Sequence, residues 1–449
     1  MRAILLFLFF ITALTSSWDL IGAIDVAGGN LRVCALFMAM FVAVAMLTMK
    51  ANGFPRARVF GLMLIWFGFD MVCTANAPQV FRTYAYLIWL MLDVIFIYAC
   101  TAAFRTSKAV DALARIYYYT FVLLALFGIL QFVCFPIGLD LLVKQNWVSF
   151  LARINGLSYE PSYFATYLIV GWTMSLVLLT RNVHFVRPFF SWSIFILHTV
   201  TLLLCSSRLG YLGMLLMGLV MAPSIVRSLR TSKVSRILAS SVVVGFVLLV
   251  CAGGVFVMSV DDPTFLLNGT GLGGTAAHSV DTRLNEFEKY EDLFLANPLK
   301  GYSLGGIAAQ LAGAGESDSV DYDDMRHSQG INVSLEVILG TGIIGAPFFF
   351  WYFYKLTFGS LAGVRRSPDL RLRAITEANV WGLIMQFFLL QFNQNILRNY
   401  FWIQIAVVSC LVTYSLQSRA AAVPRRPLVR LRRVQVEQGG MEGLALPSA

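Results

Sequence analysis

Apolar runs of about 20 residues recur along most of this 449-residue chain. A helix needs about 20 apolar residues to cross the hydrocarbon core of a bilayer, where no water satisfies the backbone polar groups. The runs lack the strict alternation that is typical of membrane-spanning barrel strands. We therefore predict an all-α, polytopic membrane protein.

The composition agrees with this class. The chain is 58% apolar and 13% charged, with a mean hydropathy of +0.73, and no soluble domain buries so large an apolar share. The net charge of +10 does not indicate nucleic-acid binding, because the basic residues cluster in the short segments between apolar runs. The seven cysteines lack metal-ligand spacing and are interpreted as small hydrophobic residues.

We predict twelve transmembrane helices. The spans are 3–18, 31–49, 59–77, 83–104, 116–137, 163–180, 189–206, 209–226, 237–258, 333–354, 376–396 and 400–417. The first run is similar to a secretory signal peptide. We expect it to remain as an uncleaved helix, because another span follows at once.

Lysine and arginine set the predicted orientation. With a cytoplasmic N-terminus, every inside segment is basic, as the positive-inside bias requires, and the C-terminus is also cytoplasmic. These segments are 50–58, 105–115, 181–188, 227–236, 355–375 and the tail. We expect a transmembrane domain over 1–418 and a basic, disordered cytoplasmic tail over 419–449.

The longest polar stretch, residues 259–330, is predicted to be a large outside loop between spans nine and ten. A loop of this length is usually functional. Within it, residues 283–296 place apolar side chains at helical spacing and predict an amphipathic helix on the outer surface of the bundle. These side chains are Leu284, Phe287, Tyr290, Leu293 and Phe294.

Three arginines on the predicted outside are candidate anion ligands. Arg208 follows two serines in a very short connection, where its guanidinium fork suits a diphosphate at headgroup level. The alternative is snorkelling to lipid headgroups. Arg283 opens the amphipathic helix and either helps to form an anion site or pairs with Glu286. Arg153 is either a second phosphate contact or an ion-pair partner of Glu160.

His327 and Glu160 are candidate acid–base or orienting groups. His327 stands where the outside loop meets span ten, and it is either an acid–base group or a structural histidine. A metal is not predicted, because no second histidine stands at i+3 or i+4. Glu160 precedes Pro161, so it is either a helix N-terminal acid or a catalytic or substrate-orienting group.

At these residues the sequence resembles the O-antigen polymerase and O-antigen ligase superfamily of bacterial inner-membrane glycosyltransferases. The resemblance rests on RINGLSYEPSYFATYL, LLLCSSRLGYLG, DTRLNEFEKYEDLFLANPLKGYSLGG, RHSQGINVSLEVILGTGIIG and NYFWIQIA, in this order. It implies a GT-C-like helical fold in the bacterial inner membrane and an active site on the periplasmic side. It also implies that no metal or cofactor is used.

The resemblance further implies transfer of a glycan from undecaprenyl diphosphate to an acceptor hydroxyl. Arg208 and Arg283 would bind the diphosphate, and His327 would orient or deprotonate the hydroxyl. The usual His-Asn of the family is His327-Ser328 here, so the candidates for any role of that amide are Gln329 and Asn332. Expected partners are the lipid-linked glycan, membrane lipids, and a chain-length regulator and flippase of the same pathway; nucleic acid is not expected.

Polymerase and ligase both remain open. The RINGLSYEPS element is more similar to Wzy-type polymerases of O-antigen, capsule or exopolysaccharide, which favours a polymerase over a ligase that transfers the glycan to lipid A-core. A non-enzymatic transporter of polysaccharide or lipid-linked sugar is a further alternative. It predicts charged or broken helices near the bilayer midplane and paired repeats.

Overall fold

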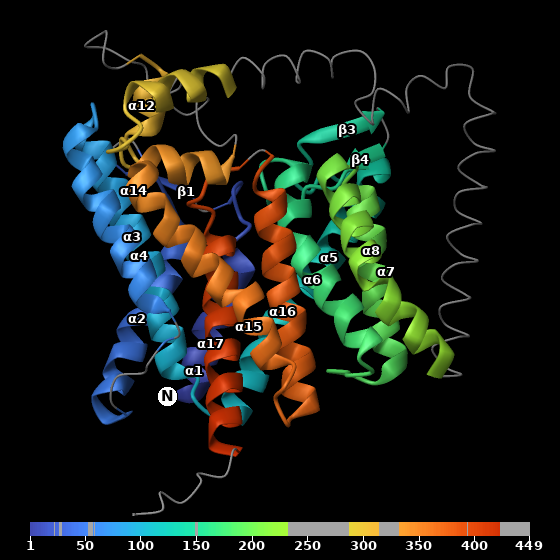
Figure 1. Cartoon of the computed structure of the whole chain (residues 1–449). Coiled ribbons are helices and arrows are strands. Elements are labelled where there is room, and N and C mark those ends of the chain that lie inside the picture. The colour runs from blue at the N-terminus through green and yellow to red at the C-terminus, as the bar shows by residue number, and fades with distance from the viewer. Residues whose placement is uncertain are drawn as a thin grey trace, which may run out of the picture.

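The computed structural model describes residues 1–21, 23–26, 29–52, 57, 59–148, 151–231, 287–313, 332–392 and 394–422. They form a bundle of helices that run between two ends (Figure 1). The helices are α1 (Arg2–Thr15), α2 (Val33–Asn52), α3 (Phe60–Cys73), α4 (Val80–Ala103), α5 (Ser107–Cys134), α6 (Pro161–Thr180), α7 (Pro188–Leu204), α8 (Arg208–Thr231), α12 (Ile307–Leu311), α14 (Val333–Leu356), α15 (Phe358–Val364), α16 (Leu370–Leu389) and α17 (Asn399–Ala422), with 3-10 turns η1 (Thr74–Asn76) and η2 (Phe135–Ile137).

A helix lies over every predicted span except 237–258, which is outside the described residues. Among the described helices, six are long and apolar enough to cross a membrane, and four shorter helices are also apolar. A polytopic helical membrane protein is therefore the class that the structure supports. The number of twelve crossings, the GT-C-like arrangement and the division into 1–418, 259–330 and 419–449 stay predictions.

Two short β-hairpins add to the predicted all-α architecture. In the first, β1 (Ala23–Val26) pairs antiparallel with β2 (Gly29–Arg32). In the second, β3 (Gln145–Val148) pairs antiparallel with β4 (Leu151–Arg153), with an irregularity in register between Asn146 and Val148. Strands of three or four residues are too short to show the alternation that predicts a strand.

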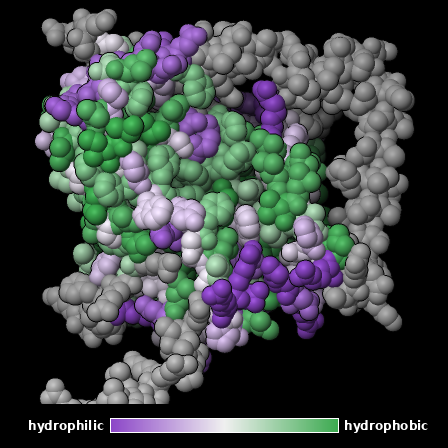
Figure 2. Space-filling view, viewed as in Figure 1, coloured by the Kyte–Doolittle hydropathy of each residue, from purple (hydrophilic) through white to green (hydrophobic). Residues whose placement is uncertain are grey.

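Both hairpins and α12 lie toward one end of the bundle, and the N-terminus lies toward the other (Figure 1). We call the end with β3, β4 and α12 the outer end, because the charge pattern predicts these segments outside, and the opposite end the inner end. Hydrophobic residues cover most of the middle of the face in Figure 2, and hydrophilic residues gather toward its upper and lower edges. This distribution is typical of a protein with a lipid-facing belt.

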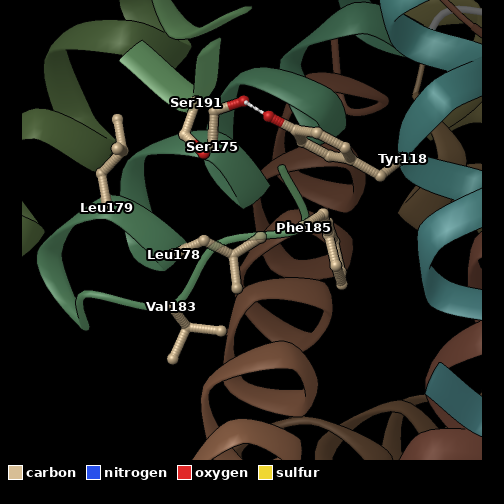
Figure 3. A pocket seen from close by; sticks show the side chains of 7 residues that line it. All are labelled: Tyr118, Ser175, Leu178, Leu179, Val183, Phe185 and Ser191. Atoms are coloured by element: carbon tan, nitrogen blue, oxygen red, sulfur yellow. Dashed lines mark hydrogen bonds between the residues drawn. The ribbon is translucent and has the colours of Figure 1, made fainter. Parts of the chain in front are cut away.

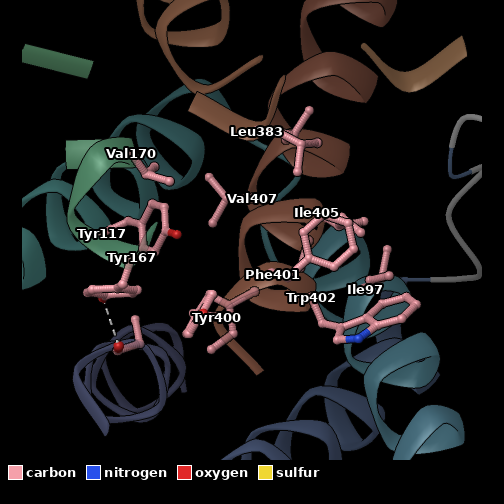
Figure 4. Close-up of a cluster of buried hydrophobic side chains, with 14 of the residues drawn as sticks. Ile97, Tyr117, Tyr167, Val170, Leu383, Tyr400, Phe401, Trp402, Ile405 and Val407 are labelled. Carbon is pink, nitrogen blue, oxygen red and sulfur yellow. Dashed lines mark hydrogen bonds between the residues drawn. The ribbon is translucent and has the colours of Figure 1, made fainter. Parts of the chain in front are cut away.

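Helix α6 is the centre of the packing. It is buried along almost its whole length and packs against α5, α7, α8 and most extensively α16. Close approach depends on small residues, since a Cβ at Gly171 would lie 2.5 Å from the Cβ of Phe121. Tyr167 of α6 meets Tyr400 of α17 in the aromatic core shown in Figure 4, with ring centroids 5.6 Å apart.

Helix α14 is broken at Gly342, whose φ of 65° and ψ of 178° are open to glycine and costly for other residues. The carbonyls of Leu339 and Gly340 accept hydrogen bonds from the N–H groups of Tyr302 and Ser303, both at 2.8 Å. These partners belong to residues 298–304, a segment of the predicted outside loop 259–330. The carboxylate of Asp70 in α3 accepts from the N–H of Leu304 at 2.9 Å and fixes the same segment.

Charged side chains gather at the inner end as well. Glu377 of α16, which is fully buried, pairs with Arg181 at 2.8 Å and with Arg365 at 3.2 Å. Arg371 pairs with Asp111 at 3.0 Å. All three arginines belong to segments that the positive-inside pattern predicts to be cytoplasmic, so the helix ends are arranged as that pattern requires.

Candidate functional site

Arg208 is the first residue of α8 and is exposed at the outer end. The preceding turn is tight, because Ser206 has a positive φ of 48°. The Oγ of Ser207 accepts the N–H of Gly210 at 3.4 Å, so this serine caps the helix. Arg208 therefore combines a cationic side chain with the positive end of a helix dipole, as an anion site requires.

Arg153 lies beside Arg208. Its guanidinium donates to Oε1 of Gln145 at 2.6 Å and to the carbonyl of Ser206 at 2.9 Å, so it ties the β3–β4 hairpin to the turn before α8. Burial lowers the pKa of Arg153, and the charge of Arg208 lowers it further, although an arginine stays protonated. Two neighbouring cations of this kind favour a bound anion. Phosphate contact by Arg153 stays a prediction.

Glu160 occupies the predicted position at the N-terminus of α6, immediately before Pro161. It is half-buried, and its Oε2 accepts a hydrogen bond from the Oγ of Ser162 at 2.9 Å. Its negative charge acts on the guanidinium groups of Arg153 and Arg398. Glu160 therefore lies within electrostatic range of cations on two different elements.

Arg398 was not predicted as a site residue. It is 8% exposed, and its Nη1 lies 3.2 Å from both carboxylate oxygens of Asp19. Arg32 pairs with the same carboxylate at 2.9 Å. The guanidinium of Arg398 also stacks 4.0 Å from the centroid of the Tyr163 ring, on the first turn of α6.

The charges of this group stabilise one another. Burial alone would raise the pKa of Asp19, but Arg32 and Arg398 outweigh it, and the pKa is lowered. Burial alone would lower the pKa of Arg398, but Asp19 and nearby groups, including Glu160, raise it. A sequence signal existed for Arg398, because it is an arginine at the outside end of a span, against the positive-inside bias, just as Arg208 is.

Arg283 and His327 lie outside the described residues, so their meeting with Arg208 stays a prediction. The flanking residues are described. A helix covers 287–296, with Tyr290 and Leu293 buried against the bundle. Phe287, which we placed on the apolar face, is 41% exposed, so this residue is not part of the packed face; Leu284 lies outside the described residues.

The start of α14, a few residues after His327, is anchored to the connection between α16 and α17. Asn332 caps α14 by accepting the N–H of Leu335 at 3.0 Å, and its side chain donates to the carbonyl of Gln391 at 3.0 Å. The buried carboxylate of Glu336 accepts the N–H of Ile396 at 2.7 Å. A few residues after His327, the chain is therefore held in place at the outer end by the hydrogen bonds of Asn332 and Glu336.

Two small cavities lined by described residues do not include Arg208 in their lining. One is lined by Tyr118, Ser175, Leu178, Leu179, Val183, Phe185 and Ser191 (Figure 3). The other is lined by Tyr86, Leu304, Ile307, Glu336, Asn395, Ile396 and Leu397. Each has a volume of about 10 Å³, which is room for about one water molecule. Neither cavity can hold a lipid diphosphate, so the exposed surface at Arg208 is the better candidate.

The bundle and its cationic outer end define a polytopic helical membrane protein with an anion-binding candidate site. Residues 193–350 match the family model Wzy_C, which is described as O-antigen ligase. This match confirms the resemblance to the O-antigen polymerase and ligase superfamily and supports a glycosyltransferase-like enzyme that acts on a lipid-linked glycan. The matched stretch contains Arg208, Arg283 and His327, whereas Arg153, Glu160 and Arg398 lie outside it. No curated protein matches the chain.

Proposed function

We propose that the protein is a Wzy-type polymerase that joins repeat units linked to undecaprenyl diphosphate at the periplasmic face of the inner membrane. The observation that carries the proposal is Arg208, which opens α8 within the family match and lies beside Arg153. A lipid diphosphate presents its charge at headgroup depth, where this pair of cations lies if the outer end is periplasmic.

In the proposed reaction, an acceptor hydroxyl forms a bond to the anomeric carbon of the donor sugar. The bond from that carbon to the diphosphate oxygen breaks, and the diphosphate leaves with the electron pair. Arg208 and Arg283, assisted by Arg153, stabilise the charge that develops on the leaving oxygen. Because guanidinium groups supply this positive charge in a fixed fork, we propose that the transfer needs no metal.

The proton of the acceptor hydroxyl needs a base within hydrogen-bond reach. We propose that His327 takes or orients this proton and that Glu160 orients the sugars or assists the transfer. The position of Glu160 within electrostatic range of Arg153 and Arg398 supports this role.

A ligase that transfers the finished glycan to lipid A-core is the second candidate, and the description of the matching family favours it. A transporter has one supporting observation, the broken helix α14. The carbonyls of Leu339 and Gly340 at that break are hydrogen-bonded to backbone N–H groups of Tyr302 and Ser303. These carbonyls are bonded within the protein and are not left for a substrate, which favours the enzyme.

The test replaces Arg208, Arg283 and His327 singly with alanine in cells that lack the native gene copy. Arg227→Ala is the matched control, because Arg227 lies at the opposite end of the same helix as Arg208. Membrane abundance is measured for each variant, and glycan chain length is resolved on gels. Lipid-linked intermediates are identified by mass spectrometry.

A polymerase predicts that the three variants accumulate single lipid-linked repeat units and that Arg227→Ala makes normal long chains. Accumulation of long lipid-linked polymer would identify a ligase instead. Precursor trapped on the cytoplasmic side would identify a transporter. Normal long polymer in all three variants would contradict an enzymatic role for these residues.

A further inference from the structure

The connection between α16 and α17, residues 390–398, is bonded to the helices around it at the outer end. The carbonyl of Gln391 accepts from Asn332, and the N–H of Ile396 donates to Glu336, both at the start of α14. The indole of Trp402 donates to the carbonyl of Ile396 at 2.8 Å. These bonds fix Gln391 and Ile396 on the two sides of the connection, and Arg398 is its last residue.

Arg398 links the connection to the segment that follows α1. That segment is itself bonded to the residues before α6, because the N–H groups of Asp19 and Leu20 donate to the carbonyl of Leu157 at 2.9 and 3.1 Å. The N–H of Tyr159 donates to Oδ2 of Asp19 at 3.4 Å. The carboxylate of Asp19, which pairs with Arg398, therefore also contacts the residue that immediately precedes Glu160.

Arg398 also reaches Glu160 through α6. Its guanidinium covers the ring of Tyr163, and the N–H of Tyr163 donates to the carbonyl of Glu160 at 3.1 Å. Asp19 and Tyr163 therefore approach the first turn of α6 from two directions, and Arg398 contacts both. The charge of Arg398 and that of Glu160 also act on each other directly.

A buried ion pair is weak support for a purely stabilising role, because removing charges from water is costly. The cost is visible here, since the Nε of Arg398 is buried and has no hydrogen-bond partner within the part of the chain that the structure describes. An apolar residue of similar size would fill this place without that cost. The buried guanidinium of Arg398 is therefore better explained by a role in orienting a functional side chain.

We propose that Arg398 is a positioning residue for Glu160: with Asp19 and Tyr163, it holds the first turn of α6 and the Glu160 carboxylate in the working orientation. The inference rests on the proposed function, in which Glu160 orients or assists the transfer. The proposal adds Arg398, which lies outside the family match, to the residues that serve the site. Through the connection that ends at Arg398, it also links α14, which follows His327, to Glu160 at the start of α6.

The test is a double-mutant cycle on the full-length protein in proteoliposomes, with a lipid-diphosphate-linked oligosaccharide as donor. The variants are Arg398→Gln, Glu160→Gln and the double variant, and kcat and KM are measured for each. Arg371→Gln is the matched control, because it removes an arginine from an ion pair with an aspartate at the inner end. Arg208→Ala reports on the proposed function itself.

We expect Arg398→Gln to lower kcat by about tenfold or more with little change in KM, and to cost less than about twofold when Glu160 is already glutamine. Arg371→Gln should retain the turnover of the unmodified protein. If Arg398→Gln does not reach the membrane, Tyr163→Leu removes the ring under the guanidinium and enters the same cycle. An equal loss in both Glu160 backgrounds, or full activity of Glu160→Gln, would overturn the positioning role. Loss of activity in Arg208→Ala beside such a result would leave the proposed function standing, whereas full activity of Arg208→Ala would refute that function.

Discussion

Replacing Gly342 with alanine should destabilise the outer end by an amount that follows from the geometry of the break in α14. The φ and ψ of Gly342 lie in a region that costs a residue with a side chain about 1–3 kcal/mol. A Cβ there would also overlap the carbonyl oxygen of Leu299, so residues 298–303 must move.

That movement breaks three backbone hydrogen bonds, from Tyr302, Ser303 and Ile343, with lengths of 2.8, 2.8 and 2.9 Å. Each contributes about 0.5–1.5 kcal/mol net, so with the backbone strain the total loss is about 2.5–7.5 kcal/mol. At roughly 2 °C per kcal/mol, the melting midpoint in detergent should fall by about 5 °C or more. Activity should fall with it, because residues 298–304 anchor the loop that carries Arg283.

The assay is size-exclusion chromatography of the detergent-solubilised protein after heating. Gly68→Ala is the matched control, because a Cβ at this glycine of α3 would meet no atom within 4 Å. Alanine is favourable inside a helix, so its midpoint should stay equal or rise slightly. If Gly342→Ala melts with the unmodified protein, the break and its hydrogen bonds do not carry the stability assigned to them.

Three further outcomes are expected. Arg208→Ala should lower the transfer rate in proteoliposomes by about 100-fold or more. Arg208→Lys should retain part of the rate, because lysine keeps the positive charge but lacks the two-pronged guanidinium. Equal rates for both variants would contradict a bidentate phosphate contact. Asp19→Asn should melt at a lower temperature than the unmodified protein at pH 7, and this difference in melting temperature should close as the pH falls below about 4. The folded pKa of Asp19 is lowered, so its stabilising contribution is lost only as the pH falls through that pKa. A difference that is constant with pH would refute the ion pair with Arg32 and Arg398. Glu377→Gln should lower the free energy of unfolding by about 1–3 kcal/mol, which is less than for a fully buried pair because Arg181 and Arg365 reach solvent. Turnover per folded molecule should stay unchanged. A loss of turnover in folded protein would contradict a purely structural role of the inner end.

The helical framework followed from the sequence because each helix has its own local signal. Apolar length predicted the helices, and the arginine clusters predicted which ends lie together at Glu377 and Arg371. The break at Gly342 was not predicted, because GTGIIG is as apolar as the helix around it. Its cause is hydrogen bonding to Tyr302 and Ser303, about forty residues earlier, which no local pattern displays.

The candidate site was predicted in part for the same reason. Arg208 was predicted in a very short connection between two spans and Glu160 before a proline, and both lie at the starts of helices. Arg398 and Asp19 are 379 residues apart, so their ion pair exists only in the folded chain. The bias that singled out Arg208 applies to Arg398 as well and would have identified it.

The most direct measurement is a cryo-electron microscopy structure of the protein in lipid nanodiscs with a non-transferable phosphonate analogue of the lipid-diphosphate donor. We predict that the diphosphonate lies within hydrogen-bond distance of Arg208 and Arg283, with His327 facing the anomeric carbon. A diphosphonate bound elsewhere, or Arg208 and His327 on opposite sides of the membrane, would contradict the proposed transfer.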